Sequence, residues 1–174
     1  MNSKKSGVDS YNHNLETSQE FFKNICSTHS WDERYLTCEY SLEVGLGLCA
    51  GGIMGIGESL EDRKSFYKSL KKLNPHTSPV NFFIPNESLS IKQEVMSKEE
   101  ALECIRLAKN YLPNARLMMA GGREVVFKKE QKEMFEAGIN AIVLGNYLTA
   151  KGDNPMNDIA LLKSYGYSLA TSCH

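Results

Sequence analysis

The chain has 174 residues, of which 41% are hydrophobic and 24% are charged, and its formal net charge is -1. Such a composition is typical of one globular domain with a substantial core, and the charge balance excludes a basic nucleic-acid-binding surface. No apolar run is long enough to span a membrane and no signal-peptide pattern follows the lysines at residues 4 and 5, so we expect a cytoplasmic protein.

Short apolar runs alternate along the chain with longer segments of helical periodicity. Ser30 and Ser97 each precede a glutamate by three residues, which predicts a capping box at the start of two helices. The predicted helices run from Ser30 to Gly45, from Ser59 to Asn74, from Ser97 to Pro113, and over residues 128–137 and 158–165. The predicted strands are residues 8–12, 46–50, 79–84, 115–119 and 139–144.

This alternation indicates parallel strands joined by helical crossovers, and therefore an α/β protein. An open doubly wound sheet and a (βα)8 barrel are both compatible with it. Long, polar, glycine-bearing segments follow the strands, whereas the links from helix to strand are short, and this asymmetry favours a barrel with its functional loops after the strands. Five strands, however, do not close an eight-stranded ring.

The five cysteines are odd in number and widely spaced, which argues against a disulfide framework and against a local zinc site. Any bound metal would therefore take ligands from distant parts of the chain or from another chain. Considered by itself, a cysteine at the end of an apolar strand is more often a packed thiol than a metal ligand. The five are Cys26, Cys38, Cys49, Cys104 and Cys173.

The stretch GGIMGIGE after the second predicted strand places Gly51, Ile53, Gly55 and Glu58 in the order GxIxGxxE. It matches neither the dinucleotide fingerprint nor a P-loop. Glycine at these positions would let the backbone approach a planar ligand, with Ile53 as an apolar surface beside it. A plain glycine-rich turn is the alternative interpretation.

Polar residues interrupt three of the predicted strands or follow them directly. Asn14 and Glu16, in SYNHNLETS, suit hydrogen bonds to a ribose or a polar heterocycle, or else cap a turn. Asn81 lies inside the apolar run PVNFFI and must bond either a ligand or a neighbouring backbone group. Arg116 interrupts ARLMM, and a buried arginine needs an anionic or metal-bound partner unless it snorkels from an edge strand.

Taken together, YNHNLETS, LCAGGIMGIGE, VNFF, ARLMMAGGRE and the ending ATSCH resemble the biotin synthase family of radical S-adenosylmethionine enzymes, in order, over residues 7–174. The resemblance implies a (βα)8 barrel that inserts sulfur into dethiobiotin to form biotin. It also implies S-adenosylmethionine, a [4Fe–4S] cluster and a [2Fe–2S] cluster as cofactors, and a homodimer for the intact enzyme.

Carried over to this sequence, the resemblance makes Cys49 and Arg116 catalytic ligands of the [2Fe–2S] cluster. It implies that Asn14 and Asn81 bind dethiobiotin. The positions implied for S-adenosylmethionine are Asn14, Glu16, Gly51, Ile53, Gly55 and Glu58, although the family commonly has Asp where Glu16 stands. The other four cysteines match no ligand of the family.

The sequence also departs from the family pattern. The CxxxCxxC motif that holds the [4Fe–4S] cluster is absent, and the first three barrel strands, with two thiolate ligands of the smaller cluster, have no counterpart. Residues 1–6 match nothing, and we expect residues 7–174 to form a single partial barrel. We expect it to be inactive without the missing N-terminal half of the barrel; an inert truncated product or a fragment of another radical S-adenosylmethionine enzyme is the alternative.

Overall fold

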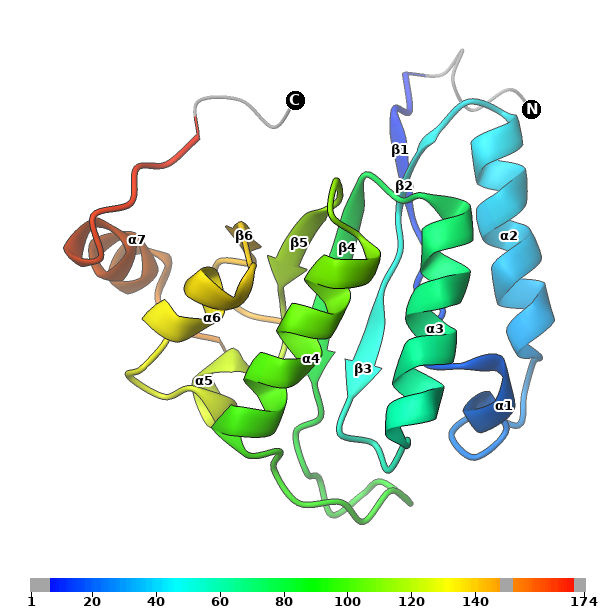
Figure 1. Ribbon diagram of the computed structural model, residues 1–174, viewed down its shortest axis with the longest axis horizontal. Helices are drawn as coiled ribbons and strands as arrows, with labels where there is room; N and C mark the ends of the chain where they lie inside the picture. Colours follow the sequence, from blue (N-terminus) through cyan, green and yellow to red (C-terminus); the bar gives the residue numbers. More distant parts are fainter. Residues whose placement is uncertain (1–6, 148–151, 171–174) are drawn as a thin grey trace.

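The structure, a computed structural model, describes residues 7–147 and 152–170 (Figure 1). Short parallel strands form one sheet, and helices connect most of them. The strands are β1 Ser10–Asn12, β2 Gly47–Cys49, β3 Gly52–Met54, β4 Thr77–Phe82, β5 Arg116–Met119 and β6 Ala141–Ile142. The helices are α1 Gln19–Phe22, α2 Trp31–Glu43, α3 Leu60–Leu73, α4 Lys98–Tyr111, α5 Arg123–Val126, α6 Lys132–Ala137 and α7 Pro155–Ser164.

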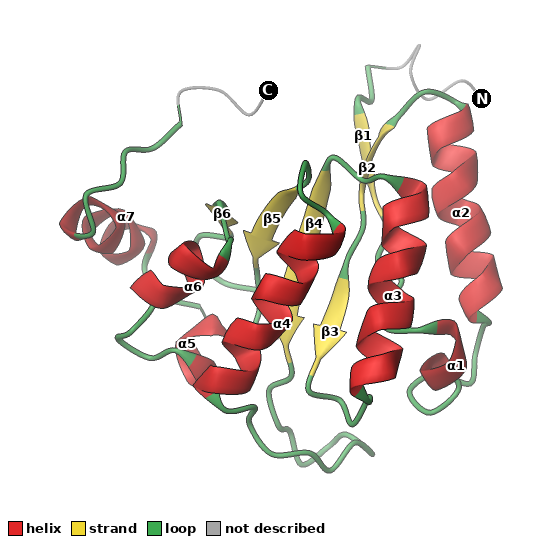
Figure 2. Ribbon diagram, viewed as in Figure 1, coloured by secondary structure: helices red, strands yellow, loops and turns green. Residues whose placement is uncertain are grey.

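The order of the strands in the sheet follows their order in the chain. The path is β1-β2-β4-β5-β6, and β3, which continues β2 along the chain, pairs with a later part of β4. A doubly wound sheet would instead reverse its order at a switch point. Helices α2, α3 and α4 lie side by side over the same face of the sheet (Figure 2). Sequential parallel strands with helices outside form the wall of a (βα) barrel, which confirms the predicted partial barrel.

The helix-covered face of the sheet is the core of the protein. Val80 and Phe82 of β4 and Leu117 and Met119 of β5 are at most 2% exposed. They form one apolar cluster with side chains of α3 and α4, among them Leu70. Alternate residues of each strand therefore point into this layer, and the residues between them point to the opposite face.

All five predicted strands overlap observed ones, with three corrections. The strand predicted at 46–50 is broken at Ala50–Gly51 and continues as β3, and the strand predicted at 139–144 is paired only over Ala141–Ile142. The strand predicted at 79–84 begins earlier, at Thr77. The break between β2 and β3 lies where backbone groups form hydrogen bonds outside the regular strand pairing: Gly51 O accepts from the N–H groups of Leu15 and Glu16.

The helix predictions hold best where a cap marks the start. The capping box at Ser30 is present, and Ser59 forms another with Asp62. At Ser97 the hydroxyl caps the helix, but the Glu100 carboxylate pairs with Arg63 at 2.8 Å instead of completing a box. The helices predicted at 128–137 and 158–165 begin at Lys132 and Pro155, and the four-residue helices α1 and α5 were not predicted.

Helix α7 is tied to the rest of the domain by a buried ion pair. Arg123, at the start of α5, is fully buried, and its Nη2 donates to Oδ2 of Asp158 in α7 at 2.7 Å. Its Nη1 donates to Gln131 Oε1 at 2.6 Å. Both charges are out of contact with water, so Asp158 depends on Arg123 for compensation. Arg123 also pairs with Glu124 Oε1 at 3.2 Å.

Gly52→Ala tests the close approach of β3 to the segment after β1. A Cβ at Gly52 would collide with the backbone carbonyl oxygen of Glu16, which cannot move without breaking its bond from Ile53 N. We expect a loss of about 2 kcal/mol in the free energy of unfolding, measured by urea denaturation. In the control Gly47→Ala the new Cβ meets the movable His76 ring at 3.3 Å and Asp9 O at an ordinary contact distance of 3.4 Å, so stability should hardly change. Equal losses would contradict the prediction.

Asp158→Ala tests the buried ion pair. Removing the carboxylate leaves the buried Arg123 charge with only the longer pair to the partly exposed Glu124, and we expect a loss of about 3 kcal/mol in thermal or urea unfolding. The matched control is Glu136→Ala, which breaks a pair to Lys132 whose side chains are more than half exposed. That change should cost no more than about 0.5 kcal/mol. A similar small effect for Asp158→Ala would show that the pair does not anchor α7.

Candidate functional site

The candidate ligands Cys49 and Arg116 lie in one row across the sheet. Strand register pairs Asn12 with Cys49, Cys49 with Thr77, and Thr77 with Arg116. Partners in such a row point to the same side of the sheet, and two strand spacings separate the backbones of Cys49 and Arg116 by about 10 Å. The two side chains therefore share a face, as joint action on one ligand requires.

This face is the one that the helices do not cover. Thr77 and Asn81 alternate along β4 with the core residues Val80 and Phe82, and Arg116 alternates in the same way with Leu117 on β5. Ile53 is the register partner of Asn81, so it belongs to the same face. The sheet thus separates an apolar layer under the helices from a layer of polar and apolar side chains that carries the candidate residues.

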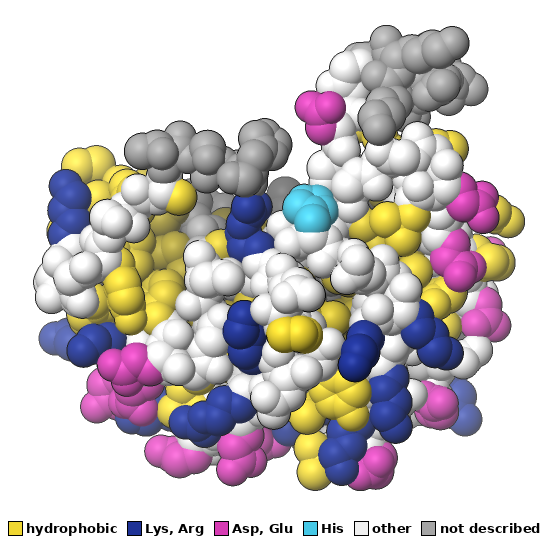
Figure 3. Space-filling model, turned by 45° about the horizontal axis from the view of Figure 1, so that its top comes forward, with side chains coloured by type: hydrophobic (Ala, Val, Ile, Leu, Met, Phe, Trp, Pro, Cys, Tyr) yellow, Lys and Arg dark blue, Asp and Glu magenta, His cyan; other side chains and the backbone are white. Residues whose placement is uncertain are grey.

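The charges on the molecular surface are mixed. Figure 3 shows basic and acidic side chains spread over the surface in that view, without a continuous patch of one sign.

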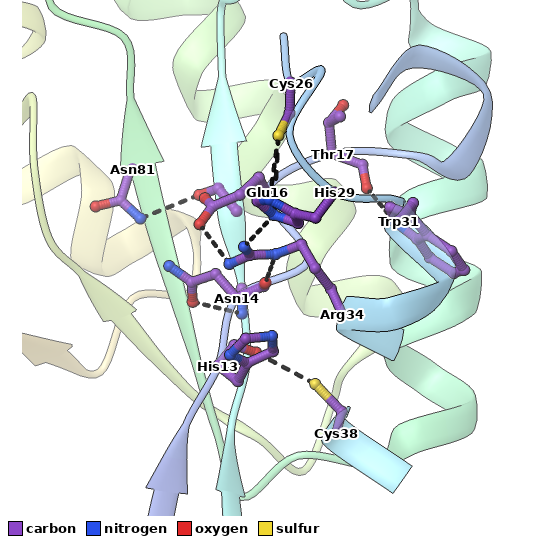
Figure 4. A network of polar contacts seen from close by, with 12 residues as sticks. His13, Asn14, Glu16, Thr17, Cys26, His29, Trp31, Arg34, Cys38 and Asn81 are labelled. Carbon is purple, nitrogen blue, oxygen red and sulfur yellow. Dashed lines mark hydrogen bonds and ion pairs between the residues drawn. The ribbon is translucent and has the colours of Figure 1, made fainter. Parts of the chain in front are cut away.

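Asn14 and Glu16 are held at the end of β1 by backbone groups and by Arg34 of α2 (Figure 4). Asn14 Oδ1 accepts from Gly51 N at 3.0 Å, and Arg34 Nε donates to Asn14 O at 2.7 Å. Arg34 Nη2 pairs with Glu16 Oε1 at 3.2 Å. Burial raises the pKa of Glu16, and the charge of Arg34 opposes that rise. Glu16 itself has the left-handed backbone angle φ 67°, which turns the chain away from β1.

Arg34 was not singled out from the sequence, although a signal was present. It lies three residues after Trp31 and four before Cys38, both of which are buried. That spacing places it on the inward face of α2, where an arginine needs an acceptor.

The side chain of Asn81 bonds two neighbouring backbone segments. Its Nδ2 donates to Gly52 O at 3.1 Å, and its Oδ1 accepts from Gly121 N at 3.0 Å. Backbone partners, one of the two alternatives for this residue, are therefore present. A carboxamide has two N–H groups and two acceptor lone pairs, so this arrangement still leaves one of each for a further partner.

In the GxIxGxxE motif, Glu58 shapes the loop. Its carboxylate accepts from Gly55 N at 2.9 Å and from Ile56 N at 2.8 Å, and it pairs with Arg63 Nε at 2.6 Å. Gly55 has φ 85°, a conformation that favours glycine. A Cβ at Gly51 would collide with the backbone oxygen of Pro79. These glycines are therefore needed for a turn and for close strand packing, and contact of the motif with a nucleoside stays a prediction.

Three of the four described cysteines are buried, and burial raises the pKa of each thiol. The pKa rises to about 11 at Cys38, whose thiol donates to His13 O, and to about 12 at Cys104. For Cys49 burial is the cause as well. Over residues 7–147 and 152–170, no three Cys, His, Asp or Glu side chains are placed to bind a metal ion together. Cys173 lies outside the described residues.

Cavities lie at the rim of the domain beyond β3. One of about 380 Å³ includes Gly55, Glu58 and Arg63 in its wall. A larger one of about 630 Å³, between the loop before α4 and helix α5, contains none of the candidate residues. Within the described part of the chain, no helix is both long and apolar enough to cross a membrane.

Known proteins give this arrangement a context. The family model described as "Biotin and Thiamin Synthesis associated domain" matches residues 79–168. Biotin synthase of Wolinella succinogenes is 62% identical over 171 residues, covering 98% of this chain and 61% of the relative. Biotin synthase of Helicobacter pylori strain P12 is 61% identical over 171 residues, covering 97% of this chain and 61% of the relative. The chain thus spans about three fifths of the length of these curated relatives.

Two solved structures share the fold. Methylornithine synthase (PylB) superposes with a TM-score of 0.75 at 16% identity, over 97% of this chain and 54% of that protein. HydG, a maturase of the [FeFe]-hydrogenase, superposes with a TM-score of 0.78 at 19% identity, over 95% of this chain and 40% of that protein. At these identities the likeness concerns the fold alone. The family match, in contrast, covers more than half of the sequence, and the chain therefore belongs to the Biotin and Thiamin Synthesis associated domain family, with its resemblance to biotin synthase confirmed.

Proposed function

We propose that this chain forms the part of a biotin synthase that faces the sulfur-donating cluster, S-adenosylmethionine and dethiobiotin. The observation that carries the proposal is the row that brings Cys49 and Arg116 to the uncovered face of the sheet. The high identity to biotin synthases, against 16% to methylornithine synthase, favours dethiobiotin over another substrate. The proposal includes a cytoplasmic location and, for the complete enzyme, a homodimer.

The donor set fits one side of a [2Fe–2S] cluster. Cysteine thiolate is the usual ligand of such clusters, which take four protein ligands, and Cys49 and Arg116 supply two. Because burial raises the pKa of the Cys49 thiol, metal binding must release its proton. When bound, the clusters and S-adenosylmethionine supply the one-electron chemistry and the sulfur.

The donor set does not fit a [4Fe–4S] cluster. The sequence has no CxxxCxxC motif, and the described residues contain no comparable group of ligands. We therefore assign this cluster and the remaining ligands of the smaller one to the part of biotin synthases that this sequence does not cover. β1 lies at an edge of the described sheet and is exposed throughout, so its outer backbone groups are available to pair with a further strand.

The polar residues around the row have positioning and binding roles in this proposal. Arg34 fixes the Glu16 carboxylate, whose remaining lone pairs can accept hydrogen bonds from ribose hydroxyls. Asn81 is held by two backbone groups and offers its second N–H and second lone pair to the ureido group of dethiobiotin. Asn14 is anchored to Gly51 N and offers its amide N–H groups to the nucleoside or the substrate. Ile53 and the turn at Gly55 supply the apolar side of the nucleoside site.

Coexpression with the N-terminal part of the Wolinella succinogenes enzyme tests the proposal. After reconstitution with iron and sulfide, we expect visible absorbance from both clusters and formation of biotin from dethiobiotin. Cys49→Ala should remove the [2Fe–2S] absorbance and biotin formation and spare the [4Fe–4S] absorbance, because it deletes one ligand of the smaller cluster only. The control Cys104→Ala changes a thiol buried beside Met96 and should retain both.

Two results would contradict the assignment. If Cys49→Ala kept the [2Fe–2S] absorbance, Cys49 would not be a ligand. If the wild-type mixture bound no iron although the two polypeptides copurified, the shared face would not be a cluster site.

A further inference from the structure

A chain of polar contacts outside the proposed cluster site begins at Cys26, in the loop between α1 and α2 (Figure 4). Cys26 Sγ lies 3.4 Å from His29 Nδ1 and 3.5 Å from Thr28 Oγ1, and the latter two atoms are 3.0 Å apart. His29 Nε2 lies 2.9 Å from Arg34 Nη1. The edge of the Phe22 ring packs against the imidazole, with ring centroids 5.6 Å apart, and helps to fix its position.

Arg34 determines which nitrogen of His29 carries the proton. A guanidinium can only donate hydrogen bonds, so Nε2 must be the acceptor, and the proton of the neutral ring is on Nδ1. That N–H points toward Thr28 Oγ1, 3.0 Å away. Cys26 Sγ is 3.4 Å from Nδ1 and 3.8 Å from Nε2, so the sulfur lies over the face of the imidazole ring and not in line with its N–H. The Thr28 hydroxyl accepts from His29 and can turn its own hydrogen to the sulfur, which makes Sγ the acceptor of the group. An environment of donors stabilises a thiolate over a thiol.

Cys26 differs from the other described cysteines both in exposure and in the direction of its pKa shift. It is half-buried, whereas Cys38, Cys49 and Cys104 are buried. Hydrogen bonding to Thr28 is the largest cause that lowers the pKa of Cys26, and bonding to the backbone of His29 and the charge of Arg34 add to it. An accessible thiol among donors is the environment in which cysteines react.

We propose that Cys26 is a modification site, a nucleophilic thiol that exchanges with small disulfides and uses Thr28 and His29 to stabilise its thiolate. In the exchange, the Cys26 thiolate attacks one sulfur of the disulfide. A new S–S bond forms to Cys26, the old S–S bond breaks, and the second half of the reagent leaves as a thiolate. No other oxidant is needed. None of these groups belongs to the row of Cys49 and Arg116, and Arg34 is the residue that the site shares with the segment of Asn14 and Glu16.

The test compares labelling rates of each cysteine in the full 174-residue chain. Reduced protein is treated with limiting iodoacetamide at neutral pH, native or in guanidinium chloride, and each cysteine is quantified by peptide mass spectrometry. Exposure alone cannot make a native thiol react faster than the same thiol in the denatured chain. We expect Cys26 to react at least about twofold faster in the native chain, because its larger thiolate fraction outweighs a modest loss of nucleophilicity. Cys38, Cys49 and Cys104 should react more slowly in the native chain than in the denatured one.

Variants test whether the hydrogen-bond donors around Cys26 cause its fast labelling. Thr28→Val and His29→Ala should each lower the native rate of Cys26 to the denatured value, with circular dichroism confirming that the fold is retained. The matched control His76→Ala removes another exposed histidine and should leave the rate unchanged. With oxidised glutathione as the disulfide probe, the mixed disulfide should form first at Cys26. A native wild-type rate at or below the denatured rate would overturn the proposal, as would preferential reaction of a buried cysteine.

Discussion

The register of the parallel strands is the constraint on which the site depends. It places Cys49 and Arg116, two strands apart, in one row on the uncovered face. Because side chains alternate between faces, a slip of one residue would turn both toward the helices. The same slip would move Val80 and Leu117, at most 1% exposed, out of the core, so burial of the core opposes it. The chemistry of one face is therefore positioned by the hydrophobic effect acting on the other.

Much of the fold could be predicted because its signals are local. Serine caps, glycine and proline stops and apolar runs indicated the long helices and every strand except β3, and short helix-to-strand links favoured the barrel. Helices α1 and α5 span only four residues, too few for a periodicity to be recognised. The pairs formed by Arg123 with Asp158 and by Arg34 with Glu16 join residues far apart in the sequence and leave no local pattern.

The candidate site was only partly predictable, for a similar reason. Composition and spacing identified unusual residues, and the family resemblance gave them roles, but neither could show what holds them in place. Glu58 is an example: its carboxylate accepts from the backbone of Gly55 and Ile56 and pairs with Arg63. The glycines of the same motif permit close backbone contacts, so what looked like room for a ligand is first a requirement of strand packing.

Arg34 links two loops that are separate in the sequence, since it contacts His29 on one side and Asn14 O and Glu16 on the other. Because the two loops share this guanidinium, the stability of each loop conformation depends on the other loop. Substitutions in one loop and in the other should therefore be non-additive in a double-mutant cycle, although the loops share no direct bond through those residues. In related sequences, changes near Glu16 and near His29 should then tend to occur together, so that the two segments evolve as one unit.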